Sequence, residues 1–353
     1  MAYSTISKPS LYFNTKLYTG NGNTDTAITG VGFQPDLSII KARDMTYDHN
    51  VMDAVRGSTK RIATNLTDAE STQAEMIKSF ASDGFNLGNN GGVNQDTKTY
   101  VAWNWKAGTN GSGTTTGSGT AKTYTYSVNT AAGFSIVRWT GNGTAGHQIP
   151  HHLGVKPELI LPHKLSYTSD WIVGSEYLDT SIPWQKYLKL NTQDAVADGD
   201  NYNDVVPTTS VFTVGDTGAL NGNNETYVAY CFASKKGYSK IGKYTGTGST
   251  NGRFIYTGFK PAFIFSKKIN ASGTQWTIWD NKRSSSGNNP RNKILHPNVT
   301  NAENTADDTD FLSNGFKLKT TASGANNLND TFLYLAIAEN PIVGSNNIPA
   351  TAG

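Results

Sequence analysis

The chain has 353 residues and a net charge of +3, and its basic residues form no run longer than a pair, which argues against a nucleic-acid partner. No stretch approaches the roughly 18 apolar residues of a membrane helix, and the first residues lack the pattern of a secretory signal, so we expect no membrane insertion and a protein kept in the cytosol after synthesis. Abundant Gly, Thr and Asn, 11% aromatic residues and a single cysteine, Cys231, predict an all-β chain without internal disulfides.

One phrase occurs three times along the chain. It reads YTGNGNTD from Tyr18, WTGNGTAG from Trp139 and YTGTGSTN from Tyr244, and a proline follows its first residue after 17, 18 and 17 positions. Each copy ends in a similar way, with an apolar strand that begins TYVAWNW, TYVAYCF or TFLYLAI. The copies recur after 121 and 105 residues, which is the length of a domain and too long for a propeller blade or a solenoid turn.

The repeat predicts three β-sandwich modules in tandem. We place module one, with an N-terminal arm, at residues 1–106, a flexible Gly/Ser/Thr linker at 107–123, module two at 124–236, module three at 237–340 and an extended tail at 341–353. The linker contains no apolar anchor, so we expect module one to be loosely tethered while modules two and three dock as a pair.

Each module is expected to run through the same elements in chain order. An aromatic-ended strand leads into the glycine turn, and because no helix follows, that turn is not a phosphate-binding loop. The proline then begins a core strand. The segment from Thr67 resembles a capped helix, but Asp-Gly before Phe85 predicts a hairpin there, with at most a short helical turn ahead of it. The closing strand is apolar on both faces, which predicts a mid-sheet position covered on both sides.

Candidate catalytic and metal-ligating residues are few. Four histidines cluster in module two, but no cysteine or carboxylate stands at ligand spacing among them, which favours turn and core histidines over a metal site. Those residues are His147, His151, His152 and His163. Asp198, Asp200 and Asp204 share one loop, yet the Glu of a calcium-binding hand is missing, so a solvated acidic loop is favoured.

Two further features are weighed against a structural role. Cys231 falls on the small-residue face of its strand and is interpreted as a buried residue instead of a reactive thiol. Asp53 and Arg56 recur in module three as Asp280 and Arg283, whereas module two has Ser175 and Leu178, and such a pair usually attaches a loop to a sheet. No acidic pair recurs in a shared strand context, so we assign no catalytic, cofactor-binding or metal residue.

Phrases spread over the chain carry a resemblance to a known family. They include YFNTKLYTGNG, GFQPDLSIIKARD, TYVAWNWKAG, GYSKIGKYTG and AIAENPIVGSNNIPATAG, and HHLGVKP is similar to the HGLGxxP phrase of phage virion modules, with His152 in place of the usual glycine. The chain resembles virion structural and tail-fibre-like proteins of tailed phages, notably marine ones. The resemblance implies a place on the virion after assembly in the host cytoplasm, jelly-roll or concanavalin-like sandwiches, and no catalytic residues.

The function expected is therefore a non-enzymatic structural protein on the virion exterior, with capsid or tail proteins as partners. Head decoration is favoured over a tail or fibre position, because the chain has no heptads, collagen-like triplets or short β-helical repeats that would build a shaft. The alternative is a tail adhesin that binds a host-surface glycan, and an enzyme is the third class. The two terminal segments lie outside the repeat and are expected to be docking arms that the modules do not need for folding, and a homo-oligomer is left open.

Overall fold

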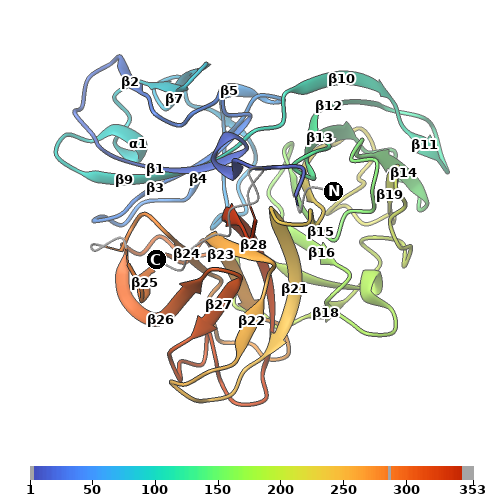
Figure 1. The fold of residues 1–353 in the computed structure, drawn as a ribbon. Coiled ribbons are helices and arrows are strands. Elements are labelled where there is room, and N and C mark those ends of the chain that lie inside the picture. Colours follow the sequence, from blue (N-terminus) through green and yellow to red (C-terminus); the bar gives the residue numbers. More distant parts are fainter. Residues whose placement is uncertain (1–3, 285–287, 344–353) are drawn as a thin grey trace.

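The computed structural model describes residues 4–284 and 288–343, and almost all of its regular structure is β-strand. Among these residues the helical elements are η1 (Pro9–Leu11), α1 (Gly91–Asn94) and η2 (Pro183–Gln185). The strands in this described part of the chain form six sheets in three lobes around a common centre (Figure 1). The all-β prediction is therefore confirmed.

Module one contains a large and a small antiparallel sheet. The large sheet has the order β1-β9-β3-β4-β5-β6 and the small one β2-β8-β7. Their strands are β1 (Phe13–Thr19), β2 (Thr26–Ile28), β3 (Leu37–Ala42), β4 (Asn50–Asp53), β5 (Gly57–Ala63), β6 (Ser71–Thr72), β7 (Ile77–Ala81), β8 (Gly84–Leu87) and β9 (Thr99–Trp105).

Module two repeats this arrangement with additional strands. Its large sheet has the order β10-β12-β13-β20-β15-β16-β17-β18 and its small sheet β11-β14-β19. The strands are β10 (Thr109–Thr114), β11 (Thr116–Gly117), β12 (Thr123–Asn129), β13 (Phe134–Thr140), β14 (His147–Pro150), β15 (Leu159–Lys164), β16 (Ile172–Ser175), β17 (Lys186–Lys189), β18 (Ala197–Asp198), β19 (Val211–Val214) and β20 (Thr226–Phe232).

Module three has two sheets of four strands, β21-β28-β23-β24 and β22-β27-β26-β25. The strands are β21 (Ser239–Thr245), β22 (Phe254–Tyr256), β23 (Phe259–Lys268), β24 (Thr277–Asp280), β25 (Arg291–Ile294), β26 (Asn304–Leu312), β27 (Gly315–Leu318) and β28 (Thr331–Pro341). In every module the closing strand (β9, β20 or β28) lies between the first strand of the repeat and the strand at the proline, which follows Pro35 and Pro157 but contains Pro261.

Each large sheet packs one face on the small sheet of its own module. In module one, Tyr100 and Ala102 of β9 share a buried cluster with Ile28 of β2 and with Phe85 and Leu87 of β8. Modules two and three have equivalent clusters. Apolar side chains on the facing sides of two sheets thus make each module a sandwich.

The opposite face of each large sheet points to the centre of the molecule and packs on the other two modules. Trp103 of β9, Tyr230 of β20 and Leu335 of β28 stand at equivalent positions of the repeat, and all three belong to one buried cluster, which we call the joint core. The prediction that the closing strands are buried on both faces is confirmed, since Trp103 is 0%, Tyr230 2% and Leu335 3% exposed. The second cover is provided by the neighbouring modules.

The repeated glycine turn is held by a repeated asparagine. Asn94 accepts a hydrogen bond from the Asn21 amide at 3.0 Å and donates to the carbonyls of Asn23 and Gly88. Asn221 and Asn326 make the same kind of contacts in modules two and three. All three asparagines are at most 1% exposed, so the phrase recurs because a buried amide must satisfy the turn.

The prediction of a flexible linker at 107–123 is wrong. That segment contains β10 and β11, which pair with β12 and β14. Gly111 and Gly113 lie directly against the rings of Tyr126 and Tyr124, where a side chain on either glycine would clash. The glycines that indicated flexibility instead allow close cross-strand packing. Module one is not loosely tethered either, because it shares the joint core with both other modules.

The N-terminal arm is also part of the fold. Ile6 and Phe13 are each 2% exposed and belong to the joint core, and Phe13 begins β1. The expectation that the modules do not need this segment is therefore wrong, because apolar arm residues complete a core that one module alone cannot close. Of the predicted tail, residues 344–353 lie outside the described residues, and Pro341 is the last residue of β28.

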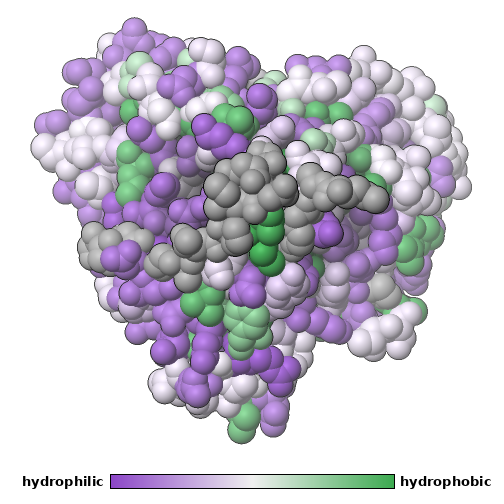
Figure 2. Space-filling model, in the orientation of Figure 1, coloured by the Kyte–Doolittle hydropathy of each residue, from purple (hydrophilic) through white to green (hydrophobic). Residues whose placement is uncertain are grey.

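The hairpin predicted before Phe85 is confirmed, since β7 and β8 pair around the turn at residues 82 and 83. The only α-helix in the described ranges is the four-residue α1, which the sequence did not predict, and no helix there is long and apolar enough to cross a membrane. On the face shown in Figure 2, hydrophobic residues form small groups among hydrophilic ones.

Candidate functional site

Hydrogen bonds join each module to the next at the seams between them. Three backbone hydrogen bonds run around the centre in one direction: Glu70 N–H donates to Leu165, Val196 N–H to Ile269 and Glu303 N–H to Arg43, at 2.9, 2.8 and 2.7 Å between N and O. The three donors stand at equivalent positions of the repeat, and so do the three acceptors. Modules one, two and three therefore form a closed ring with pseudo-threefold symmetry.

Two further side-chain hydrogen bonds between modules lie at equivalent positions of the repeat. The indole N–H of Trp171 in module two donates to the Ala63 carbonyl of module one, and that of Trp276 in module three donates to the Lys189 carbonyl of module two, both at 2.9 Å. The equivalent residue of module one is His49, which lies beside His296 of module three but outside hydrogen-bond geometry. Burial lowers the pKa of His49, and nearby cations lower it further.

Three buried basic side chains occupy a further equivalent position. His163 donates from Nε2 to the Asp68 carbonyl across the seam to module one, and Lys267 donates to the carbonyls of Gln193 in module two and Thr274 in its own module. Lys41 is bonded to carbonyls of module one. Burial lowers the pKa of Lys41 and of Lys267 to about 8, and that of His163 to about 4.

A buried ion pair lies at the seam between modules one and two. Arg56 is paired with Asp53, both side chains are 0% exposed, and Glu70 lies 3.2 Å from Arg56. The hydroxyl of Tyr230 in module two donates to Asp53 Oδ2 at 2.7 Å. Burial lowers the pKa of Arg56, but the Asp53 carboxylate outweighs this effect and the pKa is raised, so the guanidinium stays charged.

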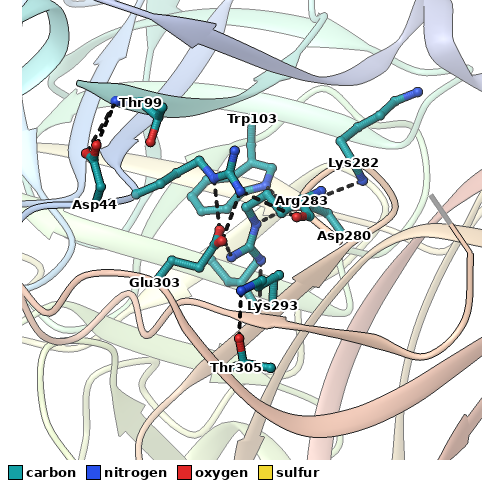
Figure 3. Close-up of polar contacts among 11 residues, drawn as sticks. Asp44, Thr99, Trp103, Asp280, Lys282, Arg283, Lys293, Glu303 and Thr305 are labelled. Carbon is teal, nitrogen blue, oxygen red and sulfur yellow. Dashed lines mark hydrogen bonds and ion pairs between the residues drawn. The ribbon is translucent and has the colours of Figure 1, made fainter. Parts of the chain in front are cut away.

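The seam between modules three and one repeats this pair. Arg283 is bonded to Asp280, again with both side chains 0% exposed, and the indole N–H of Trp103 in module one donates to Asp280 Oδ2 at 3.0 Å. Figure 3 shows Arg283 between Asp280 and Glu303, over the ring of Trp103. Arg43 of module one also binds Glu303, at 2.9 Å. Burial raises the pKa of Asp280, but Arg283 outweighs it and the pKa is lowered.

The third seam, between modules two and three, has no such pair. At the positions of the aspartate, the arginine and the glutamate, this seam has Ser175, Leu178 and Val196. Leu335 stands at the position of Trp103 and Tyr230, the aromatic residues that donate a hydrogen bond to the aspartate. Leu178 and Leu335 belong to the joint core, and Val196 packs against it. The third seam thus differs from the other two at all the charged positions and at the hydrogen-bond donor. This is expected, because a buried charge without its partner lowers the free energy of unfolding.

The predicted role of the Asp-Arg pairs was therefore incomplete. Each pair does fix its own loop, since Asp53 and Asp280 accept from the amide of the arginine three residues later. In addition each pair binds an aromatic residue of the neighbouring module. The partners of these pairs were not predicted from the sequence; they are Trp103, Tyr230, Glu70 and Glu303. The signal was present in the repeat, because the third seam, which lacks the pair, has Leu335 and Val196 at the equivalent positions.

The four histidines of module two do not form one site. His147 bonds Thr115 and Asn221, His151 bonds the Thr208 carbonyl, and His152 bonds the Tyr124 hydroxyl. In the described part of the chain no group of three or more His, Cys, Asp or Glu side chains is placed to hold a metal ion. His152 has φ 60°, the left-handed region that favours the glycine usual in that phrase.

The acidic loop and the cysteine behave as ordinary structural elements. Asp198 pairs with Lys186 at 2.8 Å, and the pKa of Asp200 is raised by burial and by the nearby carboxylates of Asp204 and Asp216. Cys231 is 0% exposed, and burial raises the pKa of its thiol, which disfavours the reactive thiolate.

A small cavity of about 50 Å³ lies in the joint core. Its lining is almost entirely apolar and includes Trp103, Tyr230 and Leu335, which are equivalent residues of the three modules. The cavity therefore lies at the centre of the ring, where three similar sheets cannot fill the space completely.

Comparison with known proteins finds one matching family. No curated protein and no solved structure matches the chain. A family described as a domain of unknown function, DUF7483, matches residues 8–341, which cover all three modules except the first seven residues of module one. The chain therefore belongs to the DUF7483 family.

Proposed function

We propose that the protein is a non-enzymatic structural protein on the exterior of a tailed-phage virion, and that it decorates the head. The observation that carries this proposal is the closed ring of three modules. Such a ring presents three similar surfaces around one axis, which fits a place where three copies of a shell protein meet. The resemblance of several sequence phrases to those of virion proteins supports the same proposal.

The chemistry of the seams supports a structural role over a catalytic one. The ion pairs at Asp53 and Asp280 are completely buried, and their polar atoms are bonded to groups of the neighbouring module. Groups with strongly shifted pKa values often mark active sites, but structural ion-pair networks shift them as well. Here each pair already has a structural partner.

The test is binding to particles that lack the protein. Purified full-length protein is mixed with heads and, separately, with tails from a phage whose gene for this protein has been deleted, and bound protein is counted by quantitative mass spectrometry. We expect saturation on heads at one chain for each cluster of three shell subunits. Saturation on tails alone would move the protein to the tail, and binding to neither part would refute the proposal.

A further inference from the structure

Module three exposes two aromatic rings where the other modules do not. Phe254 is 40% and Tyr256 51% exposed, and they stand at alternate positions of β22, on the same side of the strand. Ile255 between them is buried against Phe316. Because residues two apart on a strand are separated by roughly 7 Å, the rings form a short outward-facing row.

The row is specific to module three. The strands equivalent to β22 are β2 and β14, because each pairs a buried isoleucine with the phenylalanine of the following strand of its sheet. At the positions of the two rings module one has Ala27 and Thr29, and module two has Gln148 and Pro150. The fold therefore does not need aromatic residues there, and their exposure is a separate property of this module.

Polar groups surround the two rings. Phe254 lies over Gly315, which has no side chain to displace the ring. Lys317, the cross-strand partner of Phe254, donates to Asn251 at 2.6 Å, and the Lys240 ammonium lies 5.5 Å from the centre of the Tyr256 ring. The surface thus combines exposed ring area with amine and amide groups at its edge.

We propose that Phe254 and Tyr256 form a binding site for a polysaccharide built of pyranose sugars. A pyranose has C–H groups on one face, which stack on an aromatic ring, and hydroxyls at its rim, which bond amines and amides such as Lys317 and Asn251. A protein partner fits less well, because two rings fall far short of the roughly 800 Å² per partner that a stable interface buries. Strand β22 is at the edge of its sheet, so the row is accessible from the side.

The experiment is affinity electrophoresis of the full-length protein in native gels that contain hydroxyethylcellulose, mannan or alginate. We expect retardation by at least one of these polysaccharides. Phe254→Ala and Tyr256→Ala should each weaken the apparent affinity by roughly 3- to 10-fold, and the double variant should abolish retardation. The matched controls are Thr29→Ala and Gln148→Ala, at the equivalent positions of modules one and two, which should leave retardation unchanged.

Two outcomes would overturn the inference. One is the absence of retardation of the wild-type protein in all three gels. The other is retardation that survives in the double variant, which would mean that binding uses another surface. Thermal melting of each variant checks that it is folded. Binding of the double variant to phage particles tests the proposed structural function separately.

Discussion

Replacing Asp53 by alanine tests whether the buried ion pairs hold the ring together. The change removes the carboxylate that pairs with the Arg56 guanidinium, which is 0% exposed. It also removes the acceptor of the Tyr230 hydroxyl. Breaking a buried pair on one side costs about 3–5 kcal/mol of unfolding free energy, because an unpaired charge remains inside. Glu70, 3.2 Å from Arg56, compensates in part, so we expect a loss of about 3 kcal/mol, at the lower end of that range.

The matched control copies the residues of the third seam into the first. It combines Asp53→Ser, Arg56→Leu and Glu70→Val with Tyr230→Leu, so that charges and hydrogen-bond partner are removed together. No buried charge is then left unpaired, and the remaining cost comes from imperfect packing, about 1–2 kcal/mol. The quadruple variant should therefore be more stable than the single one.

The assay is equilibrium unfolding in urea followed by tryptophan fluorescence, since Trp103 and Trp105 lie in the joint core. Similar m-values for all variants would show that the free energies can be compared. A loss below about 1 kcal/mol for Asp53→Ala, or a quadruple variant less stable than the single one, would refute the reasoning.

Three further predictions concern the unfolding of the ring, the contribution of the N-terminal arm to stability, and the loss of stability at low pH. Because β10 and β11 lie within residues 107–122 and pair with other strands of module two, limited proteolysis of the native protein should not cut there first, and calorimetry should show one cooperative transition. Early release of module one would contradict the joint core. Ile6→Ala should reduce the unfolding free energy by about 2–4 kcal/mol in urea titrations, whereas a truly dispensable arm would give no change. Burial lowers the pKa of His151 and His163 from 6.5 to about 4, so below pH 6.5 the unfolded state binds protons that the folded state does not. The free energy of unfolding should therefore fall as the pH drops from 6.5 to 4, by about 3 kcal/mol for each histidine. Melting curves of wild type and His163→Gln over this range measure the effect, and identical pH profiles would contradict it.

The all-β class and the double burial of the closing strands could be predicted, because both depend on local patterns. Period-two apolar faces on both sides of one strand can only mean two covers, and the structure has them at Val101 and Tyr100. What the pattern could not give is the identity of the second cover. A face that packs on another module has the same composition as one that packs on a second sheet of its own.

The structure of segment 107–123 and the contacts at the seams were harder to predict from the sequence, for a different reason. Glycine indicates flexibility in isolation, and only the position of Tyr126 above Gly111 shows that the small residue is needed for packing. Likewise Asp53 and Tyr230 are 177 positions apart, so their contact could be found only by comparing what changes together among the three copies. That comparison was available in the sequence, through Ser175 and Leu335, but it required knowing that the modules touch.

The joint core also determines how the chain must be made. When module one leaves the ribosome, the inner face that contains Trp103 and Trp105 has nothing to cover it until the later modules follow. Roughly 240 residues remain to be added after β9, which at about 5–20 residues per second takes on the order of 10–50 s. During that time the apolar inner face of the first module is uncovered, so aggregation of the nascent chain competes with folding until the last strand is complete.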